Sequence, residues 1–168
     1  MLSKITMTAA AAAMLLSVSA VDSHAGNRIK IEQYGSFHGS AVAQEGRGNR
    51  AWHEQRGRGH HRQSFQRGRG NKVSSYQRGR RNKAISRQRG WRNEVVTGQD
   101  GARNYGYVSQ RGANNVTGVA QFGTRNRARV DQRGRNNAAG VFQYGHGHDA
   151  EVVQRGRGNI SLTVQGRW

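Results

Sequence analysis

Histidine pairs are the groups in this chain whose type and spacing come closest to a chemical site. His60-His61 and His146-x-His148 carry imidazoles close enough in sequence to coordinate a transition metal. Such histidines are more often structural, and His148 occupies a position where asparagine recurs elsewhere. Eight of the nine acidic residues follow residue 25, scattered without pairing, and no nucleophile, base and orienting group recur together. We therefore expect neither catalysis, a cofactor nor a metal site.

Positive charge is the second chemical signal. The net charge is +19 and the pI is about 11.8. Cations stacked within a Debye length of about 8 Å repel one another unless an anion bridges them. A polyanion bound through counterion release, such as extracellular DNA, acidic polysaccharide or lipopolysaccharide, is a predicted partner, and a solubility role before assembly is the alternative. The candidate contacts are Arg47, Arg67, Arg89, Arg111, Arg133 and Arg155.

A glutamine at every eleventh residue determines the elements that position these groups. The register holds from Gln33 to Gln165 without insertion or loss, which is the signature of a stacked repeat. The glutamines are Gln33, Gln44, Gln55, Gln66, Gln77, Gln88, Gln99, Gln110, Gln121, Gln132, Gln143, Gln154 and Gln165. Two residues after each of the first twelve lies a glycine: Gly35, Gly46, Gly57, Gly68, Gly79, Gly90, Gly101, Gly112, Gly123, Gly134, Gly145 and Gly156.

Asparagine marks the other end of each unit. It occurs at Asn27, Asn49, Asn71, Asn82, Asn93, Asn104, Asn115, Asn126, Asn137 and Asn159, with His38, His60 and His148 as substitutes. Repeated positions alternate with variable ones between Asn and Gln, which predicts strands at 27–33, 38–44 and every eleven residues to 159–165. The glycine would open a four-residue turn, x-Gly-x-x. We expect an all-β, amyloid-like β-solenoid of stacked strand-turn-strand rungs, with eleven-residue half-repeats and about 13 short strands.

Stacking of such rungs places each residue above the one 22 positions earlier, so that Asn and Gln form ladders at the ~4.8 Å strand spacing. From Val108 onward the inward positions hold valine and small residues, which predicts a small dry core. Residues 49–99 carry more polar inward groups. His60-His61-Arg62 turns a cation inward, where desolvation is costly, and we expect that unit to be distorted or locally open.

Residues 1–25 differ from the rest of the chain. Lys4 precedes an apolar run over residues 5–20, and Ser23-His24-Ala25 resembles a cleavage site. This pattern predicts a secretory signal peptide, followed by one repeat domain over residues 26–168. Neither end of the repeat array resembles a cap, so open strand edges would recruit further copies.

The pattern Gln-x-Gly-x-x-Asn-x-Ala-x-x-x-Gln, present at Gln44 to Gln55, Gln77 to Gln88 and Gln121 to Gln143, resembles the curlin repeat of bacterial curli fibres. The stretch from Ala41 to Gly46 is similar to the minor, nucleating curlin. The resemblance implies a secreted subunit that polymerises, through the periplasm and a dedicated export pore, into an extracellular adhesive amyloid of the biofilm matrix. It also implies other curlin subunits and nucleation factors as partners, with a major or a nucleating role left open.

A third interpretation follows from the Arg-Gly pairs at Arg56-Gly57-Arg58-Gly59 and Arg67-Gly68-Arg69-Gly70. Such pairs occur in disordered segments that bind nucleic acid. The fixed register and the predicted signal peptide argue against this as the primary role. Salt-sensitive DNA binding by a chain that forms no β-rich fibre would favour it.

Overall fold

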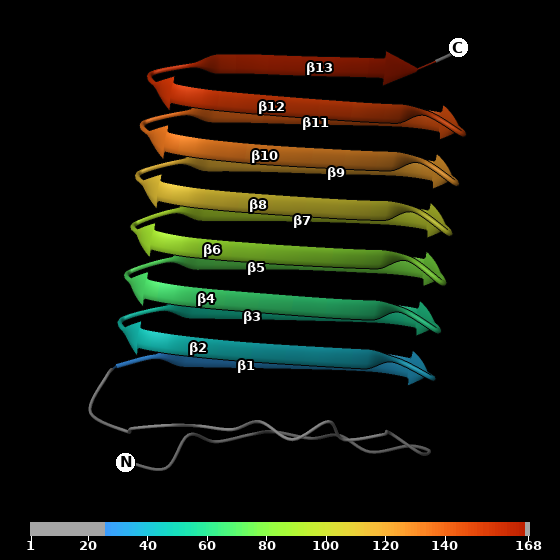
Figure 1. Cartoon of the computed structure of the whole chain (residues 1–168). Helices are drawn as coiled ribbons and strands as arrows, with labels where there is room; N and C mark the ends of the chain where they lie inside the picture. The colour runs from blue at the N-terminus through green and yellow to red at the C-terminus, as the bar shows by residue number, and fades with distance from the viewer. Residues whose placement is uncertain (1–25, 167–168) are drawn as a thin grey trace.

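The computed structural model describes residues 26–166, which form thirteen strands stacked as a two-sheet β-solenoid (Figure 1). Two successive strands make one rung of the solenoid. The predicted all-β solenoid with eleven-residue half-repeats is confirmed. The strands are β1 (Arg28–Ser36), β2 (Gly39–Arg47), β3 (Arg50–Arg58), β4 (His61–Arg69), β5 (Lys72–Arg80), β6 (Lys83–Trp91), β7 (Glu94–Ala102), β8 (Tyr105–Ala113), β9 (Val116–Thr124), β10 (Arg127–Arg135), β11 (Ala138–His146), β12 (Asp149–Arg157) and β13 (Ile160–Gly166). The predicted signal peptide lies outside the described residues.

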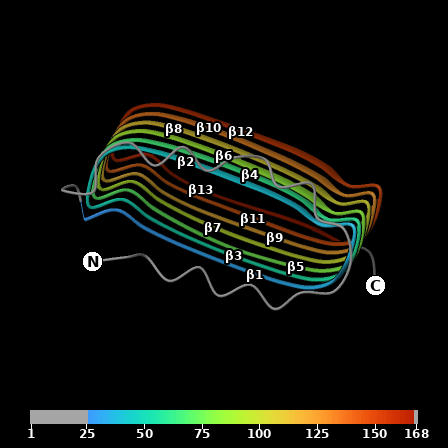
Figure 2. The ribbon, with the colours of Figure 1, turned by 90° about the horizontal axis from the view of Figure 1, so that it is seen from below.

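Odd-numbered and even-numbered strands form separate parallel sheets. The odd sheet has seven strands, from β1 to β13, and the even sheet has six, from β2 to β12. Figure 2 shows the two sheets as opposite walls of a flattened coil. Every pair aligns residues 22 positions apart, as in Gln55 opposite Gln77. A strand therefore rests on the strand two before it, and the same side-chain types recur along each wall.

The strands are longer than predicted and pass through the glycine. β1 runs over Arg28–Ser36, and only Phe37 and His38 separate it from β2. The predicted strand bounds and the four-residue turn are therefore wrong. The physical reason is that every rung bends at the same place, so parallel backbone pairing continues through the bend, as in Gly35 opposite Gly57. The corner is tight enough that a Cβ on Gly112 would overlap the carbonyl oxygen of the glycine one rung on.

A second corner residue, two positions after the glycine, also has positive φ. Glycine occupies it at Gly48, Gly59, Gly70, Gly147 and Gly158. A side chain occupies it, with φ between 50° and 59°, at Phe37, Arg81, Arg92, Arg103, Asn114, Arg125 and Asn136. The left-handed region is unfavourable for residues with a Cβ. The sequence interpretation missed this position.

The apolar core runs through the space between the two sheets. Its buried cluster extends from Val73 to Val152 and includes Val95, Val108 and Val130. Every one of these side chains is less than one tenth exposed. No helix in residues 26–166 is long and apolar enough to span a membrane.

Arg62 lies fully buried in a regular β4, so the predicted distortion of this unit is wrong. β4 pairs along its whole length with β2 and β6. The Arg62 side chain fits between the sheets because its register neighbours in the adjacent strands, Ser40 and Ala84, have small side chains. Its Nη2 donates to Ser86 Oγ at 3.2 Å and its Nε to His53 Nε2 at 3.4 Å, while Nη1 has no partner. Burial lowers the pKa of Arg62 to about 9.

Candidate assembly site

The glutamines form one continuous hydrogen-bonded ladder in each sheet. Each Nε2 donates to the Oε1 of the glutamine 22 residues later, at 2.6 Å for Gln33 to Gln55 and 3.1 Å for Gln88 to Gln110. The same pairing runs through all the rungs between β1 and β13. Each Nε2 beyond Gln33 also donates to a backbone carbonyl at the start of the preceding strand, as Gln121 does to Tyr105 at 3.1 Å. A glutamine therefore binds both the next rung and the opposite sheet.

The asparagines lie just outside the strands, where they close the corners. The Asn71 backbone N–H donates to Asn49 Oδ1 at 3.0 Å, and Asn71 Nδ2 donates to the carbonyls of Gly90 and Arg67. In the odd sheet a direct Nδ2 to Oδ1 bond is added, at 3.1 Å between Asn93 and Asn71. The ladder asparagines from Asn49 to Asn137, which exclude the corner residues Asn114 and Asn136, are no more than 1% exposed, which is consistent with complete use of their polar atoms.

Two histidines imitate asparagine in this ladder. His60 Nδ1 lies 3.2 Å from the Asn82 backbone nitrogen and accepts its proton, while His60 Nε2 lies 2.9 Å from the Arg56 carbonyl. The rings of His38 and His60 stack with centroids 5.1 Å apart. Acceptance of the Asn82 proton by Nδ1 requires a neutral ring, and burial, followed by the neighbouring His38, lowers the pKa of His60. Among residues 26–166, no group of three or more potential metal ligands comes together.

The register divides the candidate polyanion contacts into two rows. Arg67, Arg89, Arg111, Arg133 and Arg155 align one above another along the even sheet. Arg47 belongs to a neighbouring row, where it aligns with Arg69. Only part of the first row is neutralised, by Glu45, 3.2 Å from Arg67, and by Asp131, 3.1 Å from Arg133.

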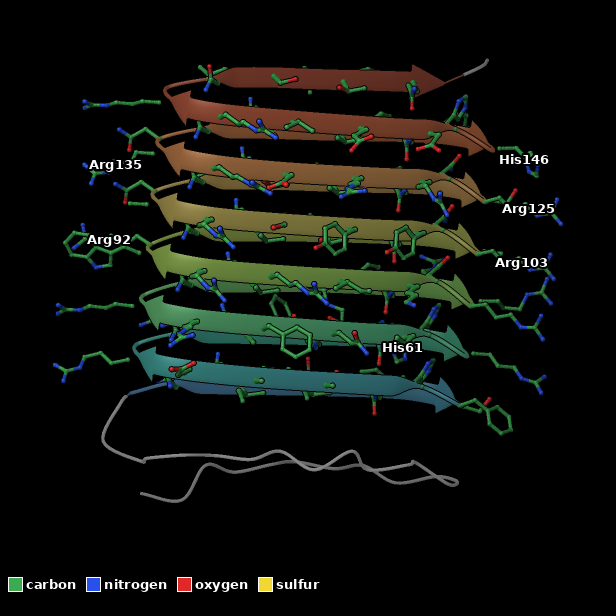
Figure 3. The ribbon with its side chains drawn as sticks, in the orientation of Figure 1. His61, Arg92, Arg103, Arg125, Arg135 and His146 are labelled. Atoms are coloured by element: carbon green, nitrogen blue, oxygen red, sulfur yellow. The ribbon has the colours of Figure 1, made fainter. Side chains whose placement is uncertain are left out.

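A second cationic surface lies at the corner that follows the odd strands. A groove of about 560 Å³ is lined there by Arg58, Arg80, Arg81, Ala102, Arg103, Thr124, Arg125 and His146. Figure 3 shows Arg103, Arg125 and His146 projecting from this corner, opposite Arg92 and Arg135. No carboxylate lines the groove. The sequence interpretation missed it because these arginines lie three and four residues after the odd-strand glutamines.

Both ends of the described solenoid expose strand edges. β1 and β2 form one end, and β12 and β13 form the other. At the first end, Gln44 Oε1 is buried without a hydrogen-bond partner, because among the described residues no glutamine lies one rung before it to donate. At the second end, Gln165 Nε2 donates to the Asp149 carbonyl at 2.9 Å, with no glutamine one rung later within residues 26–166. The ladders therefore stop with an unused acceptor at one end and donor capacity at the other.

Comparison with known proteins agrees with this architecture. A family model described as the curlin associated repeat matches residues 123–156. The matched segment runs from the end of β9 into β12. Among curated proteins, none matches this sequence. The repeat match and the β-solenoid together are consistent with a protein of the curlin family and indicate a structural subunit of the curlin type.

Proposed function

We propose that this curlin-type chain is a secreted structural subunit that self-assembles through its open strand edges into curli-like extracellular amyloid fibres, which serve in cell adhesion and in the biofilm matrix. The observation that carries the proposal is the pair of glutamine ladders, which run through every described rung and end unsatisfied. A further copy would satisfy the ladders and the unpaired backbone groups of the edge strands together.

Secretion follows from residues 1–25, proposed as a signal peptide, with residues 26–168 as the repeat domain. The curlin resemblance supports passage through the periplasm and a dedicated export pore to a cell-surface fibre. A nucleating subunit is the alternative within the same family, and sub-stoichiometric seeding of another curlin by this chain would distinguish it from an elongating subunit.

A polyanion is the second proposed partner. The uninterrupted arginine row of the even sheet and the carboxylate-free groove at the odd corner both support it. Extracellular DNA and acidic polysaccharide each supply the closely spaced anions that such a surface would attract. Two triple variants that each remove three positive charges test which surface binds, with a polyuronate and single-stranded DNA as probes. They are Arg89→Gln with Arg111→Gln and Arg133→Gln, and Arg81→Gly with Arg103→Gly and Arg125→Gly. Equal affinity in both variants and the native chain at moderate salt would contradict the proposal.

Fibre formation by purified residues 26–168 tests the structural role. We expect thioflavin-positive fibres whose diffraction shows the ~4.8 Å strand spacing along the fibre axis. A chain that folds and remains monomeric at high concentration would contradict the proposal. Fibre formation by the charge variants described above would show that assembly does not depend on polyanion binding.

A further inference from the structure

The described solenoid ends on half a rung. Of its thirteen strands, seven lie in the odd sheet and six in the even sheet. The last strand, β13, therefore has no partner strand in the even sheet to complete its rung. The next strand in the eleven-residue period would lie in the even sheet, on top of β12. That position is left open by the described residues (Figure 1).

We propose that a second copy of this chain completes the half rung, with its β1 resting on β12 and its β2 on β13. Every strand pair of the solenoid is parallel, and consecutive strands run in opposite directions. β1 can pair in parallel with β12 only if the second copy is turned by about 180° around the solenoid axis. Successive subunits are therefore related by a half-turn. This inference rests on the proposed self-assembly and specifies its joint.

The outward charges of the two edges are complementary in this register. Asp149 and Glu151 lie on the outward side of β12, and both are exposed. Continuing the 22-residue register places Arg28 of the second copy beside Asp149, and its Lys30 beside Glu151. The same register stacks Arg155 against Tyr34 of the second copy, repeating the arrangement of Arg56, whose guanidinium carbon lies 5.2 Å from the Tyr34 ring centroid within one chain.

Apolar side chains also meet apolar side chains. On the inward side, Ala150 and Val152 of β12 come beside Ile29 and Ile31 of the second copy. The latter two are only half-buried at the open end of a single chain. On the outward side of the odd sheet, Leu162 and Val164 are 74% and 65% exposed. They align with two alanines of the second copy, Ala41 and Ala43.

The orphaned ladder atom independently indicates the same joint. Gln44 Oε1 is buried and lacks a donor one rung before it. With β2 of the second copy on β13, the residue one rung before Gln44 is Gln165 of the first copy. Gln165 Nε2 already binds a carbonyl and, like Gln154 but unlike the glutamines before them, has no glutamine acceptor above it within the described chain. The joint supplies that acceptor and continues the ladder without a break.

Docking without the half-turn would place β1 of the second copy on β13. Arg28 and Lys30 would then lie beside Ile160 and Leu162, and the acids of β12 would have no strand on the side away from β10. That arrangement opposes charged groups to apolar ones and leaves a gap in the even sheet. The half-turn arrangement avoids both penalties.

Helical reconstruction of the fibre by cryo-electron microscopy tests the joint directly. The half-turn predicts a rotation close to 180° per subunit, apart from the solenoid's own small twist, with an axial rise of six and a half rungs, ~31 Å at ~4.8 Å per rung. A rotation near zero with a rise of seven rungs, ~34 Å, would overturn the inference and leave the proposed function intact. Absence of fibres would instead contradict the proposed function and the joint with it.

Deleting one repeat provides a matched structural control. Removal of residues 116–126 leaves twelve strands with the same β12 and β1 edges, so the rotation should fall to near zero with a rise of ~29 Å. Removal of residues 116–137 leaves eleven strands and should restore the half-turn, with a rise of ~26 Å. An unchanged rotation in the twelve-strand variant would overturn the inference.

Charge reversal tests the chemistry of the joint. Asp149→Lys with Glu151→Lys should slow fibre elongation about tenfold, because like charges then meet across the joint. A partner chain carrying Arg28→Glu and Lys30→Glu should restore elongation in alternating copolymers. Asp131→Lys, which alters an acid on the same sheet away from the joint, is the control and should elongate like the native chain. Native elongation by the double lysine variant would contradict the proposed pairing.

Discussion

Replacement of Arg62 by methionine should stabilise the solenoid. The Arg62 guanidinium is fully buried with no carboxylate among its hydrogen-bond partners, and burial lowers its pKa from the ordinary arginine value to about 9. At ~1.36 kcal/mol per pH unit, that lowering corresponds to a penalty of about 5 kcal/mol on the charged form at neutral pH. Methionine retains much of the length and volume of the side chain without the charge.

The gain is offset by the hydrogen bonds that Arg62 makes. Ser86 Oγ and His53 Nε2 would lose a donor, although His53 keeps Ser64 Oγ at 2.7 Å and Ser40 Oγ at 2.9 Å. Leaving buried polar groups without a donor costs about 1–3 kcal/mol. The expected net increase in the free energy of unfolding is therefore about 2–4 kcal/mol at pH 7.

Guanidinium denaturation of the soluble chain between pH 7 and pH 11 measures this effect. Above the folded pKa of about 9 and below the ordinary arginine pKa of the unfolded chain, the native state releases a proton that the unfolded state keeps, so native stability should rise with pH. The Arg62→Met variant should lack that rise, and Arg69→Met, an exposed site on the same strand, should behave like the native chain. A loss of stability in the Arg62→Met variant at pH 7 would refute the reasoning, since it would mean that the buried charge is compensated.

The other predictions concern the corners, the ladders and the histidines. Gly112→Ala should lower the free energy of unfolding by about 3 kcal/mol or more, because φ is +122° and the added Cβ meets backbone. Gly118→Ala, on the open outer face, should change it by less than about 0.5 kcal/mol, and thermal unfolding compares the two variants. Gln121→Leu should cost about 2–4 kcal/mol by denaturant titration, because ladder partners in the rungs on both sides lose their bonds. Arg103→Gly should gain about 0.5–1 kcal/mol, since relief of a left-handed φ exceeds the entropy cost of glycine, and a loss would show that the arginine makes a compensating contact. Desolvation, and then Arg62, hold the pKa of the buried His53 well below 6.5. As pH falls below about 6.5 only the unfolded state takes up a proton at this residue, so the free energy of unfolding should decline. The His53→Gln variant should show a smaller decline.

The period predicted the fold because one constraint repeats in every unit. An inward glutamine every eleven residues fixes the number of strands, their alternation between two sheets and their 22-residue register. The course of the corner was not predictable in the same way. Gly112 indicates a bend in the chain. Whether backbone pairing continues through that bend depends on the neighbouring rungs, which bend at the same place. The positive φ of Arg103 was hidden because arginine is not a residue that favours it.

Arg62 shows why a local rule failed. Burying a guanidinium is costly, and from the sequence this predicted an open rung. The structure keeps the rung closed because the serines and the alanine around Arg62 leave space for its long side chain. Similarly, Arg47 and Arg67 follow neighbouring glutamines of the same sheet, but their offsets from those glutamines differ by two residues and place them in separate rows. Both outcomes depend on three-dimensional neighbours rather than on residue type.

Hydrogen exchange at the strand edges tests the central claim, that copies join through the open ends of the solenoid. In the soluble chain, amides of β1 and β13 should exchange much faster than those of β7, which has a strand on each side. In fibres, β1 and β13 should become as protected as β7. Fast exchange that persists at both end strands in mature fibres would contradict assembly through these edges.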